Sequence, residues 1–176
     1  KEPGIRENGI RIAESHLSKS PALVRSLVKL KSDSDSRVRF QLLCTLGSVN
    51  STTADSARQH ILFHDISDKW IQTAALSASA DPLPLLRLVI AKSASQSAQY
   101  SSLLQRLVAM IATERKPETI GMLMTHFDEA NRANHPEVQA AILEGIAAGL
   151  QGNKSPTLLT KADQRANIRS FFNDES

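Results

Sequence analysis

The sequence predicts an all-α protein, a right-handed α-solenoid of about four to five stacked antiparallel helix pairs. Three observations predict this fold class. Apolar residues recur at helical spacing, as Val38, Leu42, Leu46 and Val49 do. Similar phrases return every 32 to 35 residues, a period long enough for two short helices and two turns. Ala, Leu and Ser dominate while aromatic residues make up only 4%, which favours close-packed helices over a β-sandwich.

The repeated phrase begins with an apolar residue, usually followed by Arg or Gln. Its copies start at Ile5, Val38, Ile71, Leu103 and Val138, and the first three are 33 positions apart. A run of Ser and Asp from 32 to 36 precedes the second copy, where short polar side chains are suited to cap a helix. Helix pairs this short are marginal alone in water, so each pair is expected to bury its apolar stripe against the next.

The elements follow from the apolar pattern and from prolines at first-turn positions. Helices are predicted over 5–17, 21–30, 38–49, 54–64, 70–79, 83–91, 100–113, 117–127 and 138–150. The Ser, Ala and Gln residues from Lys92 to Gln99 are predicted to form a longer loop. Residues 1–150 are interpreted as one HEAT-like repeat stack. Residues 151–176 are interpreted as a linker and capping helix, or as a truncated further repeat.

Composition and charge exclude few classes of function, but they make nucleic-acid binding and a membrane span less favoured. The 176 residues carry a net charge of +3, with acidic and basic residues interspersed, which does not favour a nucleic-acid binder. No apolar run reaches the roughly 18 residues of a membrane span. Because the chain starts at Lys1 and not at Met, an internal fragment or a processed product is expected. Cys44, the single cysteine, is predicted to be a buried structural thiol.

The histidines give the only hint of a metal site. His60 and His64 are four positions apart, which places both on one helix face, as half a zinc site requires. No third ligand follows by spacing, so hydrogen bonding is favoured and no metal is assigned. We find no nucleophile elbow, phosphate loop, haem-attachment sequence or paired catalytic carboxylates. The segment is therefore predicted to be no enzyme by itself, with no catalytic or cofactor-binding residues.

Two further features are candidates for structural or binding roles. Arg6 and Arg39 share one repeat position and could reach turn carboxylates of a neighbouring repeat, Asp33 or Asp35, as a ladder between repeats; solvated surface arginines are the alternative. Trp70, the only tryptophan, lies where a repeat begins. Packing in the core is the favoured interpretation, and an exposed anchor for a protein partner is the alternative.

Three phrases together resemble the HEAT-repeat (armadillo-like) region of large bacterial proteins described as membrane-bound dehydrogenases. They are Arg6-Glu-Asn-Gly-Ile-Arg-Ile-Ala-Glu14, Asp35-Ser-Arg-Val-Arg-Phe-Gln-Leu-Leu-Cys-Thr-Leu-Gly47 and Asp68-Lys-Trp-Ile-Gln-Thr-Ala-Ala-Leu-Ser-Ala-Ser79, and Leu143 to Leu150 is similar to the family's last copy. Gln72 departs from the pattern, since these repeats often have Arg there.

The resemblance implies a setting that the chain alone does not contain. In that family the repeat region follows a β-propeller dehydrogenase-like domain and precedes a c-type cytochrome. It therefore implies an exported, periplasmic protein, with haem or quinone cofactors only in flanking domains. No catalytic or haem-ligating residue of the family falls within this chain.

Three functions are weighed. A non-catalytic scaffold, which docks a protein partner or holds flanking domains, is favoured. The first alternative is an accessory segment that contributes to the active site of a flanking dehydrogenase or cytochrome domain. The second is a nucleic-acid-binding solenoid, for which Lys29, Lys31, Arg37 and Arg39 are the nearest cations, interrupted by acidic residues. The partner's identity and the oligomeric state do not follow from the sequence.

Overall fold

The computed structural model describes residues 2–78 and 81–151, and for residues 94–97 it describes the backbone alone. The helices are α1 (Pro3–Glu14), α2 (Pro21–Leu27), α3 (Ser36–Leu46), α4 (Thr52–His64), α5 (Lys69–Ser77), α6 (Leu83–Ala112), α7 (Pro117–Arg132) and α8 (Pro136–Leu150), with short 3-10 helices η1 (Leu17–Lys19) and η2 (Val28–Ser32). All regular structure in the described ranges is helical, so the predicted all-α class is confirmed. The capping helix predicted within 152–176 lies outside the described residues.

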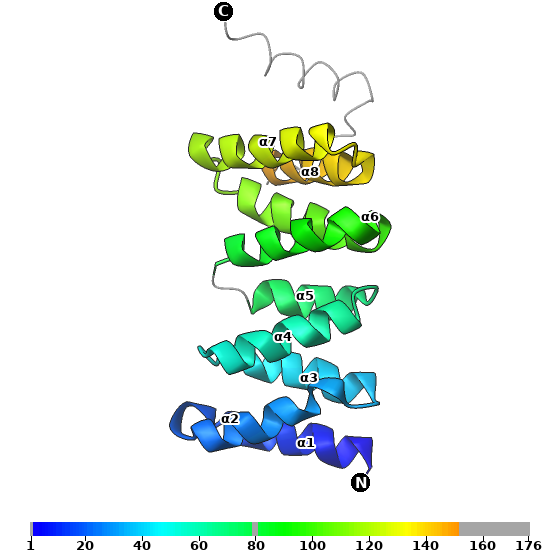
Figure 1. Cartoon of the computed structure of the whole chain (residues 1–176). Helices are drawn as coiled ribbons and strands as arrows, with labels where there is room; N and C mark the ends of the chain where they lie inside the picture. The colour runs from blue at the N-terminus through cyan, green and yellow to red at the C-terminus, as the bar shows by residue number, and fades with distance from the viewer. Residues whose placement is uncertain (1, 79–80, 152–176) are drawn as a thin grey trace, which may run out of the picture.

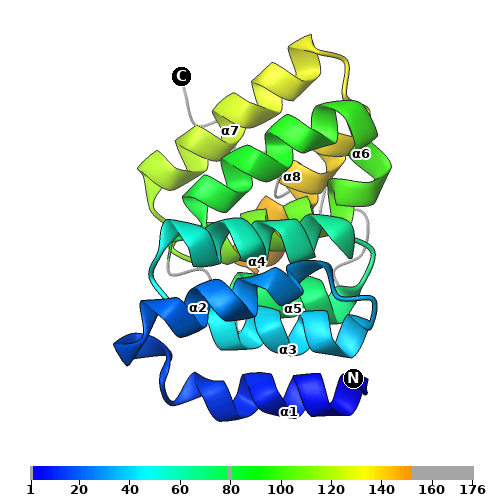
Figure 2. The same ribbon diagram turned by 60° about the horizontal axis from the view of Figure 1, so that its bottom comes forward.

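The helices lie one above another in chain order, from α1 and α2 at one end to α7 and α8 at the other (Figure 1). They form two layers. α1, α3 and α5 follow one another in one layer, and α2 and α4 lie in the other (Figure 2). Packing agrees with this arrangement, because α1 contacts α3, α3 contacts both α4 and α5, and α6 contacts α8.

Short polar side chains begin several of the helices. The hydroxyl of Ser20 accepts a hydrogen bond from the Leu23 amide, and the hydroxyl of Ser51 accepts one from the Ala54 amide. The carboxylates of Asp35 and Asp68 do the same for α3 and α5. Each bond satisfies an amide that the first helical turn would otherwise leave unpaired. The predicted helix starts are explained by these caps.

The apolar stripes that predicted the helices form the core. Leu42 and Leu46 on α3, Ile61 on α4, and Leu86 and Leu107 on α6 are fully buried. Each helix therefore buries its stripe between the two layers and against its neighbours along the stack. Such burial is the main source of stability for helices this short.

Helix α6 is where the structure differs most from the sequence-based prediction. Its backbone is helical through the predicted loop from Lys92 to Gln99, so that prediction is wrong. The stretch contains neither Gly nor Pro, and Ala, Lys and Gln are good helix formers. A straight helix of 30 residues would be about 45 Å long. Figures 1 and 2 show instead that α6 turns back, so that its two arms stay within the stack.

Candidate functional site

Two bidentate ion pairs join successive helices of the first layer, and we name them the arginine clamps. In the first, Nε and Nη2 of Arg6 on α1 each donate to the Asp33 carboxylate at 2.7 Å. In the second, Nε and Nη2 of Arg39 on α3 each donate to the Asp65 carboxylate at 2.7 Å. The planar guanidinium matches a carboxylate in this geometry and fixes both orientation and distance. The same contact thus recurs at Arg39, 33 positions after Arg6.

The second clamp is the more enclosed of the two. The side chain of Arg39 is 8% exposed and that of Asp65 15%, against 22% for Arg6 and 7% for Asp33. Arg39 also donates from Nη1 to the Asp33 carbonyl oxygen at 2.6 Å. Arg39 therefore touches the backbone next to the first clamp and the carboxylate of the second. The clamps form one connected chain of contacts.

The chain of contacts continues through amide groups. Gln72, at the repeat position of Arg6 and Arg39, donates from Nε2 to the Ile66 carbonyl oxygen at 2.8 Å and is buried. Arg106 on α6 donates to the Gln72 amide oxygen at 3.2 Å and to the Thr73 hydroxyl at 2.7 Å. At the position where Arg6 and Arg39 form ion pairs, the neutral Gln72 therefore forms hydrogen bonds. Arg106 links α5 to α6 through its bonds to Gln72 and Thr73. Spacing alone did not predict the role of Arg106.

The clamps change the charge behaviour of their carboxylates. Hydrogen bonds from Arg6 hold the pKa of Asp33 below its ordinary value, although burial opposes this. Hydrogen bonds from Arg39 do the same for the pKa of Asp65, with a smaller contribution from His64. Both carboxylates are therefore charged at neutral pH, and acid must protonate them before the clamps open.

Of the four residues predicted for the ladder, the structure brings Arg6 and Asp33 together and leaves Asp35 outside. Arg39 takes Asp65 as its carboxylate instead of Asp33 or Asp35. Asp35 caps α3 through the Arg37 amide at 2.9 Å and pairs with the Arg37 guanidinium at 3.2 Å. The capping role holds its carboxylate at the helix start, so Asp35 reaches the other arginines only through its charge.

The histidine pair does not assemble a metal centre with a third ligand. The rings of His60 and His64 stack with centroids 6.3 Å apart. Nε2 of His60 is 2.9 Å from the Ser32 hydroxyl, and Nδ1 of His64 is 3.0 Å from the Asp65 carboxylate. In the part of the chain that the structure describes, no three His, Cys, Asp or Glu side chains are grouped to hold a metal ion. The pair instead contacts the turn that carries the second clamp.

Trp70 and Cys44 are both exposed, which corrects two predictions. Trp70 is 74% exposed on α5, so its predicted packing in the core is wrong. Its amide is fixed by the Asp68 carboxylate at 2.7 Å, so the backbone that carries the indole is anchored.

Cys44 is also exposed, because Leu42, Leu43, Thr45 and Leu46 take the buried faces of α3. Partial burial and the charge of Glu14 raise the pKa of the Cys44 thiol, which does not favour a reactive thiolate.

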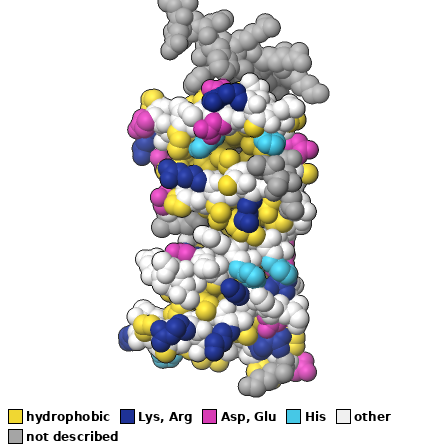
Figure 3. All heavy atoms as spheres, viewed as in Figure 1, with side chains coloured by type: hydrophobic (Ala, Val, Ile, Leu, Met, Phe, Trp, Pro, Cys, Tyr) yellow, Lys and Arg dark blue, Asp and Glu magenta, His cyan; other side chains and the backbone are white. Residues whose placement is uncertain are grey.

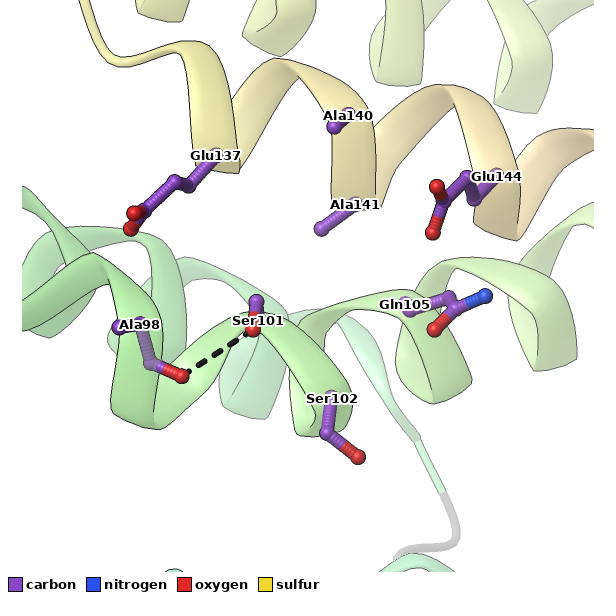
Figure 4. A pocket seen from close by; sticks show the side chains of 8 residues that line it. All are labelled: Ala98, Ser101, Ser102, Gln105, Glu137, Ala140, Ala141 and Glu144. Carbon is purple, nitrogen blue, oxygen red and sulfur yellow. Dashed lines mark hydrogen bonds between the residues drawn. The ribbon is translucent and has the colours of Figure 1, made fainter.

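A shallow groove of about 400 Å³ lies between α6 and α8. Figure 4 shows Glu137 and Glu144 projecting from α8 toward α6, where Ser101 and Gln105 form the opposite side. The Ser101 hydroxyl donates to the Ala98 carbonyl oxygen at 3.1 Å. Two carboxylates at the ends of an open groove give it negative potential, but they specify no ligand.

Basic side chains gather near α2 on the face shown in Figure 3. Lys29 and Lys31 line an open groove of about 490 Å³ next to Thr52 and Thr53 at the start of α4. Of the four cations considered for nucleic acid, Arg39 is enclosed by its clamp and cannot contact a phosphate. Arg37 is paired with Asp35. The proposed basic stripe is therefore reduced to the two lysines.

Comparison with family models, curated proteins and solved structures finds no match for this chain. The resemblance to the repeat region of bacterial dehydrogenase proteins therefore stays a prediction. Among the residues described, none of the helices has both the length and the apolar character to cross a bilayer.

Proposed function

We propose that this chain is a right-handed α-solenoid of HEAT type, with about four to five helix pairs, and that it is a non-catalytic scaffold that binds protein. The partner is a protein or a flanking domain of the same polypeptide. The helices are stacked in chain order, and the arginine clamps recur at the repeat spacing. Rigid contacts between successive repeats suit a surface that must keep its shape while it holds a partner.

The exposed indole of Trp70 is the observation that carries this proposal. The indole is 74% exposed, and tryptophan is enriched among the residues that dominate binding at protein interfaces. Polar groups lie nearby, because Arg106 donates to the Lys69 carbonyl oxygen at 3.4 Å and to the Thr73 hydroxyl. An apolar anchor beside a polar rim is the usual composition of a protein–protein contact.

Site-specific photo-crosslinking tests the proposal. A photoreactive residue at position 70 should capture one defined protein, or a flanking domain of the parent chain, in the cells that make it. The same residue at Thr53, exposed on α4 in the other layer, is the matched control. Trp70→Ala should then weaken the purified complex by about 30-fold or more, as loss of a binding hot spot does. Equal capture from both positions, or unchanged affinity of Trp70→Ala, would contradict a docking role for this surface.

A further inference from the structure

The exposed indole of Trp70 stands at a position that the repeated phrases share. One exposed residue comes directly before the first apolar residue of each phrase. These residues are Gly4, Arg37, Trp70, Ser102 and Glu137. Equivalent positions on successive helices of a stack lie on the same side of it. The positions of Ser102 on α6 and Glu137 on α8 therefore continue the row that contains Trp70 on α5.

The groove between α6 and α8 lies along this row. Ser102 and Glu137, the two counterparts of Trp70, both line it. Arg106 of α6 donates to the Lys69 carbonyl oxygen at 3.4 Å, and Lys69 directly precedes Trp70 on α5. The α6 wall of the groove is thus next to the turn of α5 that carries the indole. The indole and the groove form one continuous surface over α5, α6 and α8.

The charge of this surface changes sign from α5 to α8. Lys69 and Arg106 make the α5 end positive, and the acceptors that bind Arg106 are a backbone carbonyl, an amide and a hydroxyl, all of them neutral. At the other end, Glu137 and Glu144 project from α8 toward α6 (Figure 4). None of the described residues that line the groove is Lys, Arg or His. A basic side chain is therefore attracted to the α8 end and repelled from the α5 end.

We infer that this surface binds an extended segment of a partner protein, with an apolar side chain against Trp70 and a Lys or Arg side chain in the groove beside Glu144. The inference rests on the proposed function and adds the chemistry of the partner. The two carboxylates by themselves specify no ligand. The indole adds a fixed apolar contact, and the change of charge decides which end of the segment is basic.

The helix spacing limits the distance between the two contacts. Packed helices lie about 8–10 Å apart, so α5 and α8 are separated by about 16–20 Å across α6. An extended chain advances about 3.3 Å per residue. The apolar and the basic residue of the segment should therefore be about five or six positions apart.

Selection from a random phage-displayed library tests this inference on the purified chain. Peptides of about 12 residues are long enough, since they extend to roughly 40 Å. Enriched peptides should share an apolar residue and a Lys or Arg about five or six positions apart. Fluorescence anisotropy should show their affinity falling about 30-fold or more for Trp70→Ala and about tenfold for Glu144→Lys. Asp128→Lys, which reverses a charge exposed on α7, is the matched control and should leave the affinity unchanged.

A charge exchange separates this inference from the proposed function. An enriched peptide whose basic residue is replaced by Glu should bind the Glu144→Lys chain more tightly than the wild type. Peptides that depend on Trp70 but bind the wild type and Glu144→Lys equally would overturn the inference and leave the docking role of Trp70 standing. Enrichment of acidic peptides, or of none, would overturn it as well. Enriched peptides that Trp70→Ala does not weaken would contradict both.

Discussion

The N-terminal part of the molecule, α1 to α5, and the C-terminal part, α6 to α8, join their helices by different means. In the N-terminal part, arginine clamps fix successive helices of one layer through charged, directional contacts. In the C-terminal part, glycines on α8 let the backbone of α6 come close. A Cβ atom on Gly145 would lie 2.7 Å from the Gln105 carbonyl oxygen, and one on Gly149 would collide with the Ala109 carbonyl oxygen.

Successive helices of this molecule are therefore joined by two kinds of contact, charged pairing in one part and close backbone packing in the other. A clamp depends on pH and on both partners being present, whereas close packing depends on the absence of a side chain. Substitutions can therefore perturb one part without touching the contacts of the other.

Truncating a core leucine in each part tests whether the two parts unfold together. Leu42 on α3 and Leu107 on α6 are both fully buried. Leu42→Ala and Leu107→Ala should each lower the free energy of unfolding by about 2–5 kcal/mol, because each leaves a cavity. Urea unfolding followed by circular dichroism measures this. A single transition for both variants means one cooperative unit, and a second transition in only one variant would show that the parts separate.

Breaking the clamps should affect the N-terminal part unequally. Arg39→Met removes the more enclosed cation together with its hydrogen bond to the Asp33 carbonyl oxygen, and should cost about 3 kcal/mol. Arg6→Met removes a more exposed cation and should cost about 1 kcal/mol. The same unfolding experiment measures both variants. In a double-mutant cycle, Asp65→Asn combined with Arg39→Met should cost less than the two separate losses added together. Additive losses would show that the pair contributes no coupling.

The clamps also show what could be predicted from the sequence. Shared repeat positions marked Arg6 and Arg39 as equivalent, and the turn carboxylates Asp33 and Asp35 were predicted as their partners. Asp65 was not among the predicted partners, because it lies on a different turn, 26 positions after Arg39. Arg58, which donates to the last carbonyl of α3, Leu46, at 2.7 Å, was missed for the same reason. Which residues pair between two elements depends on how the helices pack, and the spacing of residues along the sequence does not determine that packing.

Helix faces were predicted well where one stripe was buried and poorly where two were. On α3, Leu42 and Leu43 are both fully buried while Cys44 is exposed, so a single stripe could not decide the exposure of Cys44. The loop predicted between Lys92 and Gln99 was wrong because low hydrophobicity there does not interrupt the helix. For Trp70, packing in the core was favoured over an exposed anchor, and the side chain is exposed.

Glycine substitutions test the close packing of α8 against α6 in the C-terminal part. Gly145→Ala should lower the free energy of unfolding by about 1–3 kcal/mol, since the new methyl group overlaps the α6 backbone. Gly121→Ala on α7 is the matched control, because its Cβ atom would meet nothing within 4 Å. Alanine is the better helix former, so this control should gain up to about 1 kcal/mol. Opposite signs in thermal unfolding support close packing of α6 on α8, and equal signs would contradict it.

The smallest expected effect comes from His60, which lies next to the second clamp. Burial lowers the pKa of His60 below its ordinary value, and the charges of Lys31 and His64 lower it further. The unfolded chain therefore binds a proton at this position at a higher pH than the folded chain does. Stability from the neutral ring is fully present above about pH 6.5 and decreases as the pH falls from there toward the lowered pKa.

His60→Gln can keep a hydrogen bond to Ser32 but cannot titrate. Thermal unfolding at pH 8 and pH 5 should show the wild type losing slightly more stability than His60→Gln over this interval. Equal losses would mean that protonation of His60 is not coupled to unfolding and that the N-terminal part responds to acid through its clamps alone.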